Sequence, residues 1–308
     1  MRSSTAVLLA ITATALSAPL IRAQSLPASG LSAQDLPAAI HQQEILLQQP
    51  TSRADALAWW KLARLNQDAA RYPDAQHAYT QALALLQNGD RATLADVMDG
   101  LGTLYAETGD YAHAEPLETQ ALTLREALGD RTGEGRSWMH LAMLSLGRHD
   151  IASAAHDGQL ATQRLLDPSI PSAPEEQMTA LIDLALVRCA QNLPSAAIPL
   201  LKNAHRIAQT TSPAGGFPAA FTEFLLGYAN WRDGNLHAAA TLMKRGAAGL
   251  ESQLGPQHPT YISAMAQYAT FLDQTHHTAE ASELRAHLAS GSRLPPLSPA
   301  ALTAQLHR

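Results

Sequence analysis

Apolar and small residues recur along this chain with a period of about 41 residues. In six stretches an apolar residue is followed at once by alanine or glycine, and another alanine comes twelve residues after that small residue. The later alanines, spaced 39, 40, 43, 42 and 42 residues apart, are Ala75, Ala114, Ala154, Ala197, Ala239 and Ala281. Such a period predicts an array of stacked repeats, because one repeat alone cannot bury its apolar face.

Within each period the pattern predicts two helices joined by a turn. The second repeat shows it most clearly, since apolar residues at spacings of three and four mark one helix face between Leu94 and Tyr105. Gly109 and Asp110 supply a helix stop and a cap for the next helix, and Gly129 ends that second helix. We therefore expect an all-α solenoid of about six helix–turn–helix repeats.

The solenoid is expected over residues 51–290. Before it, residues 36–50 predict a capping helix that covers the apolar end of the first repeat. Residues 24–35 are rich in Ser, Ala and Pro and predict a flexible lead. Residues 291–308 form a proline-rich tail in which a short helix over 299–307 is expected.

The first 23 residues have the pattern of a secretory signal peptide. Arg2 provides the positive start, residues 6–16 are largely apolar, and cleavage is expected after Ala23. The alternative is a membrane anchor, but Arg22 ends the apolar stretch before the roughly 20 residues that a span needs. The expected location is therefore the periplasm or the outside of the cell.

Composition and charge narrow the function classes. The chain has 46% apolar residues, mostly Ala and Leu, which are strong helix formers, and few aromatic residues. Its formal net charge is −6 and no basic run is present, which disfavours binding to nucleic acid or to an anionic membrane. The single cysteine, Cys189, cannot form an internal disulfide and is expected to be a small buried side chain.

These offsets resemble tetratricopeptide repeats, whose usual period is about 34 residues. The residues that carry the resemblance best are Leu101, Gly102, Tyr105, residues 109–111, Ala114 and Ala121. The longer period, residues 114–117 with 120–122, and residues 254–259 are similar to the kinesin-light-chain form of the repeat. The resemblance implies a right-handed superhelix whose concave groove holds a peptide or partner helix, and it implies no enzymatic activity.

Among the side chains that family geometry points into this groove, eight are the candidates for binding. They are of types that contribute strongly to interfaces, or are apolar: Trp60, Arg64, Met139, Met143, Phe224, Tyr228, Trp231 and Arg232. We expect them to hold a largely apolar peptide with a few charges, although each aromatic ring could instead pack between repeats. The positions that form a carboxylate clamp in chaperone-binding members hold Trp60, Arg64, Gly100, Arg136 and His140, so that clamp is not reproduced.

Chemistry-bearing motifs are missing from the sequence. No nucleophile elbow, phosphate loop, dinucleotide fingerprint or zinc-protease motif is present, so neither an enzyme nor a cofactor is expected. The thirteen histidines include no two that are three or four residues apart, and no metal site is expected. Two alternatives stay open, a cytoplasmic sensor module, suggested by residues 126–131, and an unrecognised hydrolase.

Overall fold

The computed structural model describes residues 31, 34–49, 55–86, 90–211 and 216–291. These residues form thirteen helices and no strand. The helices are α2 (Leu36–Leu47), α4 (Ala56–Asp68), α5 (Tyr72–Leu86), α6 (Arg91–Thr108), α7 (Tyr111–Leu128), α8 (Arg131–Gly147), α9 (Ile151–Leu165), α10 (Pro174–Ala190), α11 (Pro194–Thr211), α12 (Phe217–Arg232), α13 (Leu236–Leu254), α14 (Pro259–Gln274) and α15 (Thr278–Gly291).

Some sequence predictions lie outside the described residues. These are the signal peptide over 1–23, most of the lead over 24–35, and the proline-rich tail with its short helix over 299–307. The helix expected from residue 36 is α2, which lies against α4 at the start of the array. Gln43 of α2 donates a hydrogen bond from Nε2 to the Ala58 carbonyl oxygen at 3.0 Å.

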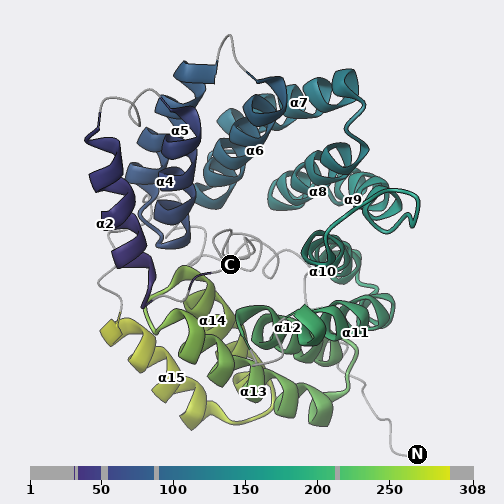
Figure 1. Cartoon of the computed structure of the whole chain (residues 1–308). Helices are drawn as coiled ribbons and strands as arrows, with labels where there is room; N and C mark the ends of the chain where they lie inside the picture. The colour runs from purple at the N-terminus through teal and green to yellow at the C-terminus, as the bar shows by residue number, and fades with distance from the viewer. Residues whose placement is uncertain (1–30, 32–33, 50–54, 87–89, 212–215, 292–308) are drawn as a thin grey trace, which may run out of the picture.

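Six helix pairs follow one another around a common centre (Figure 1). The inner helix of each pair is α4, α6, α8, α10, α12 or α14, and the outer helix is the next along the chain. All six periodic alanines are fully buried, with 0% exposure, and so are the small residues twelve positions before them. The predicted all-α solenoid of six repeats is therefore confirmed, and small residues set the close approach of its helices.

The close approach at one such position gives a test of the packing. A Cβ atom added to Gly246 of α13 would lie 2.6 Å from the Phe224 backbone nitrogen of α12. We expect Gly246→Ala to lower the free energy of unfolding by about 1–3 kcal/mol, because the two backbones must move apart. Gly158→Ala is the matched control, since its Cβ would meet Leu184 Cδ1 at an ordinary 3.6 Å. The control is expected to stabilise α9 by about 0.5–1 kcal/mol in urea unfolding, and equal effects of the two variants would contradict this packing.

The turn inside each repeat uses one residue in the left-handed region of backbone conformation. These residues have φ between 55° and 84°: Ala70, Gly109, His149, Asn192, Gly234 and His276. After the turn of the second repeat the Asp110 side chain caps α7 by accepting a hydrogen bond from the His113 backbone nitrogen at 3.3 Å, as the sequence predicts. The same turn therefore forms in all six repeats, although only two of them place glycine there.

Non-glycine residues at these turns store strain that substitution can release. Ala70 has φ 55°, a conformation in which a Cβ atom crowds the following carbonyl. We expect Ala70→Gly to raise the free energy of unfolding by about 0.5–1 kcal/mol and Gly109→Ala to lower it by about the same amount. Thermal melting of both variants measures this, and a loss of stability in Ala70→Gly would show that the turn is unstrained.

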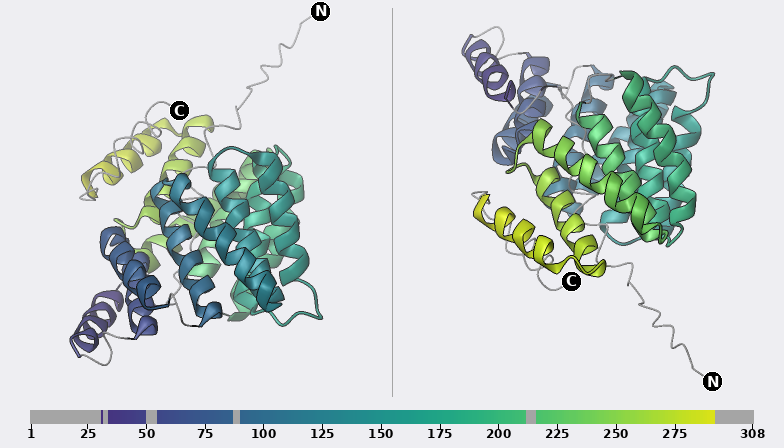
Figure 2. Two further views of the ribbon diagram at one scale, coloured as in Figure 1. Left: turned by 90° about the horizontal axis from the view of Figure 1, so that it is seen from above. Right: turned by 90° about the horizontal axis from the view of Figure 1, so that it is seen from below.

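The array curls far enough for its first and last repeats to touch (Figures 1 and 2). His258, the N-cap of α14, has Nδ1 3.2 Å from the Thr260 backbone nitrogen, from which it accepts a hydrogen bond. Its Nε2 therefore carries the proton and donates to the Asp68 carbonyl oxygen at the end of α4, at 3.3 Å. Burial lowers the pKa of His258, which keeps the ring neutral in this contact. The array thus closes on itself through a contact between the end of α4 and the start of α14.

Candidate protein-binding pocket

A pocket of about 400 Å³ lies among the first four repeats. Inner helices α4, α6, α8 and α10 supply most of its walls, and outer helices α5 and α7 contribute Tyr79, Glu118 and Arg125. The volume falls in the range of ligand pockets, about 300–1,000 Å³. It is therefore large enough for one or two side chains of a bound segment.

Four of the eight predicted groove residues line this pocket. Trp60 and Arg64 come from α4, and Met139 and Met143 come from α8. The Arg64 guanidinium carbon lies 5.5 Å from the centre of the Trp60 ring, which is a cation–π contact. The pocket thus combines an aromatic ring, a positive charge and two flexible apolar side chains.

The other four predicted residues lie elsewhere. Phe224, Tyr228 and Trp231 are buried in the core around α12. Trp231 packs edge-on against Phe271 of the next repeat at 5.7 Å and donates from Nε1 to the Gln274 side chain at 3.2 Å.

The half-buried Arg232 donates from Nη1 to the Tyr228 hydroxyl at 3.1 Å. The binding role expected of these four residues is therefore corrected. The Trp231 ring packs between the fifth and sixth repeats, which is the alternative that the sequence left open, and none of the four lines the pocket.

Arg125 of α7 crosses the wall of the pocket with only 1% of its surface exposed. Its Nη2 donates to Asp96 at 2.6 Å, and its Nη1 donates to the Ser137 hydroxyl at 2.8 Å and the Gly133 carbonyl oxygen at 2.9 Å. The same Nη1 forms an ion pair with Asp99. One guanidinium therefore joins α6, α7 and α8.

Arg136 extends this network to the fourth repeat. It donates from Nη2 to Asp96 at 3.1 Å and from Nη1 to Glu176 at 3.0 Å. Glu176 lies in the first turn of α10. Ion pairs thus connect helices α6, α7, α8 and α10 along one wall of the pocket.

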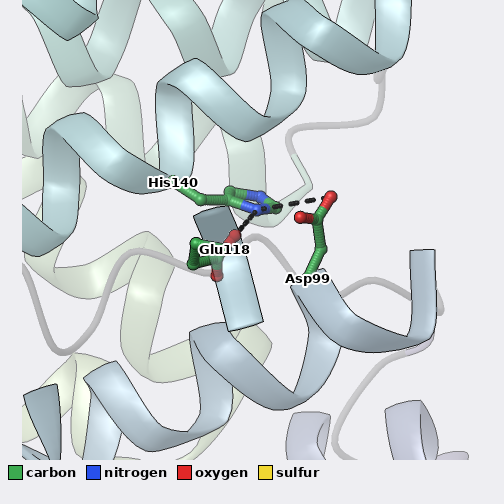
Figure 3. Close-up of side chains that lie close together, drawn as sticks. All are labelled: Asp99, Glu118 and His140. Atoms are coloured by element: carbon green, nitrogen blue, oxygen red, sulfur yellow. Dashed lines mark hydrogen bonds and ion pairs between the residues drawn. The ribbon is translucent and has the colours of Figure 1, made fainter. Parts of the chain in front are cut away.

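A histidine and two carboxyl groups from three different helices meet beside Arg125 (Figure 3). His140 Nδ1 of α8 lies 3.2 Å from Glu118 Oε2 of α7 and 3.7 Å from Asp99 Oδ2 of α6. Burial alone would lower the pKa of His140, but the two facing carboxyl groups raise it to about 10. Burial raises the pKa of Glu118, and the neighbouring Asp99 adds to this effect. At neutral pH His140 is therefore a half-buried imidazolium.

These three side chains are also a possible set of metal ligands. One oxygen from each carboxyl group and one ring nitrogen lie within 4.8 Å of one another, and this donor set suits Zn²⁺. However, the positive charges of Arg125 and protonated His140 already offset the two carboxyl groups. The absence of a metal site stays a prediction, and the site itself is a satisfied charge cluster.

Sequence reasoning missed this cluster because its members are 19 and 22 residues apart. One signal was present in the second repeat, where the small residue of the periodic pair is Gly102. A Cβ atom there would lie 2.5 Å from Glu118 Oε1, so glycine makes room for the buried carboxyl group. Gly100 similarly makes room for Tyr79, because a Cβ atom at position 100 would lie 2.6 Å from Cε1 of its ring.

Asp183 of α10 is a further buried carboxyl group on the pocket wall. It has 4% exposure, and no described residue reaches it with a hydrogen bond or an ion pair within 4.0 Å. Burial raises the pKa of Asp183 to about 8, against a smaller lowering effect from His140. The group is therefore protonated at neutral pH unless a cation approaches it.

Comparison with known families agrees with this geometry. Residues 54–127, which hold the first two helix pairs, match the family model of the tetratricopeptide repeat. The first two helix pairs are therefore tetratricopeptide repeats. No curated protein sequence matches it.

Several solved structures share the fold of this chain. The APC/C hetero-tetramer Cut9–Hcn1 superposes with a TM-score of 0.61 at 16% identity, covering 92% of this chain and 48% of that chain. A Rap protein complexed with Competence and Sporulation Factor gives 0.59 at 12% identity, covering 77% of this chain and 75% of the other. The chain therefore spans about half the length of the Cut9–Hcn1 relative.

The kinesin-light-chain form of the repeat is also found among these structures. A putative kinesin light chain from Podosopora anserina with nearly identical TPR-like repeats gives a TM-score of 0.50 at 17% identity, covering 66% of this chain and 97% of that chain. At these identities the likeness concerns the fold, and at that level the predicted longer repeat is confirmed. None of the described helices has the length and apolar character needed to cross a membrane.

Proposed function

We propose that this protein is an interaction scaffold that binds a peptide or helix of a partner protein in the pocket of its first four repeats. The observation that carries the proposal is the pocket of about 400 Å³ on the concave side, with Trp60, Arg64, Met139 and Met143 in its walls. Aromatic and methionine side chains supply contact area, and arginine supplies directional hydrogen bonds. In this role the chain binds and does not catalyse.

Two of the structurally similar proteins were solved in complexes, which supports a binding function for this fold. Cut9 is assembled with Hcn1 in a hetero-tetramer, and the Rap protein is complexed with Competence and Sporulation Factor. The rigid ion-pair network of Arg125 and Arg136 also favours binding, since a preformed pocket loses less conformational entropy when it is occupied.

Affinity capture from the producing cells tests this function. We expect the wild-type protein to retain a partner that the double variant Trp60→Ala/Met143→Ala loses. The control is Leu85→Ala/Leu128→Ala, which truncates two exposed side chains on outer helices. Equal recovery with both double variants, at unchanged helical content, would exclude the pocket as the binding site.

We also propose that the chain is exported after cleavage of residues 1–23. The positive Arg2, the apolar stretch and the small residue Ala23 carry this proposal. Export would remove two arginines and change the formal charge from −6 to −8. Mass measurement of the protein from its native cells is expected to show an N-terminus at Gln24, and an intact N-terminus would favour the cytoplasmic sensor alternative.

A further inference from the structure

We propose that the pocket recognises a lysine or arginine side chain of the partner segment and pairs its positive group with Asp183. This inference rests on the proposed function and specifies its ligand chemistry. It predicts that one cationic residue dominates recognition, although the pocket itself already contains three arginines.

The first support is the isolation of Asp183. A carboxyl group with 4% exposure is costly to ionise unless a positive group pairs with it. The other buried carboxyl groups of the pocket, Asp99 and Glu118, face Arg125 or His140, whereas no described residue offers Asp183 a hydrogen bond or an ion pair. An entering ammonium or guanidinium would supply the missing partner.

The second support is the balance of charge around the pocket. Its walls carry six carboxyl groups against three guanidinium groups and one imidazole: Asp68, Asp96, Asp99, Glu107, Glu118 and Asp183 against Arg64, Arg125, Arg136 and His140. The arginines that flank the cluster are already engaged, Arg125 with Asp99 and Arg136 with Asp96 and Glu176. While Asp183 and Glu118 hold their protons the two kinds of charge are balanced, so ionisation of Asp183 would leave a negative excess that favours a cation over an anion.

The third support is the shape of a lysine or arginine side chain. Both have an apolar stem that packs on apolar surface and a charged end that seeks a carboxylate. Met139 and Met143 offer flexible apolar walls for such a stem, and the Trp60 ring adds apolar surface although Arg64 already contacts it. These residues line the same pocket as Asp183.

Pairing with Asp183 would couple binding to the release of a proton. The carboxyl group is protonated in the free protein at neutral pH, since burial raises its pKa to about 8. An entering cation favours the ionised form, so the proton leaves to the solvent and binding strengthens as the pH rises towards 8. His140 keeps its own proton over this range because its pKa lies near 10.

Selection from a phage-displayed random peptide library with the full chain tests this inference. We expect peptides with lysine or arginine at one fixed position, and at least a tenfold loss of affinity when citrulline or norleucine replaces that residue. Asp183→Asn should cause a similar loss, whereas Glu175→Gln, at an exposed site on the same helix, should cause none. Calorimetry in two buffers at pH 7 should show release of about one proton with the wild type and none with Asp183→Asn.

The outcomes separate this inference from the proposed function. If selected peptides need Trp60 but carry no fixed cation, or bind Asp183→Asn equally well, the pocket is a binding site and the charge assignment is wrong. If no selected peptide depends on Trp60, the proposed function fails as well. Circular dichroism of Asp183→Asn checks that the variant is folded, and the citrulline comparison tests the charge preference without any variant.

Discussion

Replacing Arg125 with methionine is expected to lower the free energy of unfolding by about 3–5 kcal/mol. Methionine keeps the apolar stem but leaves Asp99 buried without its guanidinium partner. It also removes the hydrogen bonds to Asp96, Ser137 and Gly133 that join three helices. Urea unfolding followed by circular dichroism measures the loss.

Arg148→Met is the matched control for this variant. Arg148 also pairs with a carboxylate of the preceding repeat, Glu115, but both side chains are about half exposed. Exposed ion pairs contribute only about 0–1 kcal/mol, so this variant should unfold nearly as the wild type does. A loss below about 1 kcal/mol in Arg125→Met would show that the buried network does not hold the repeats together.

Raising the pH from 6 to 9 is expected to destabilise the protein by at least about 2 kcal/mol. Folding raises the pKa of His140 from 6.5 to about 10 and the pKa of Asp183 from 3.8 to about 8. For both groups the folded state binds the proton more tightly than the unfolded state. Their stabilisation is therefore complete below the unfolded pKa and is lost as the pH rises through the folded pKa.

Between pH 6.5 and pH 8 both His140 and Asp183 lie between their unfolded and folded pKa values, so the fall in stability should be steepest there. Each group contributes a slope of up to about 1.4 kcal/mol per pH unit there. Glu118, whose pKa folding also raises, adds to the fall in both proteins. Asp183→Asn removes the contribution of Asp183, so its stability should vary less with pH and should exceed that of the wild type at pH 9. Urea unfolding midpoints at pH 6, 7, 8 and 9 check this, and parallel profiles for both proteins would contradict the burial of Asp183.

The fold could be predicted from the sequence because the residues that mark each repeat lie close together along the chain. The alanines twelve residues after each small residue mark where two helices touch, and all six are fully buried. The adjacent residues Gly109 and Asp110 likewise predict a turn and a cap for the next helix. Ala70 and His149 were harder, since nothing local indicates a left-handed residue, and only their place in the repeat reveals the turn.

The site could be predicted only in part. Trp60, Arg64, Met139 and Met143 reach the pocket because they lie on the inner face of inner helices. Phe224 and Tyr228 have the same positions in the fifth repeat, but both are buried in the core around α12, where Phe271 of the next repeat packs against Trp231. Such packing depends on how successive pairs rotate, which the residue pattern alone does not fix.

Glu118 illustrates the opposite error, a functional candidate on an outer helix. Its position on α7 predicts packing between helices, yet glycine at position 102 lets its carboxyl group reach the pocket wall beside His140. Asp183 was similarly hidden within an apolar run of α10. Buried charges of this kind come from three-dimensional juxtaposition, because the groups that meet lie on different helices.

Site-specific photo-crosslinking in the producing cells tests the use of the pocket most directly. A photoreactive amino acid at position 143 lies in the pocket wall, and one at position 128 lies at an exposed site on outer helix α7. We predict that position 143 forms a crosslink to one defined segment of a partner protein, identified by mass spectrometry, and that position 128 does not. No crosslink at position 143, or the same products from both positions, would contradict a binding site on the concave side.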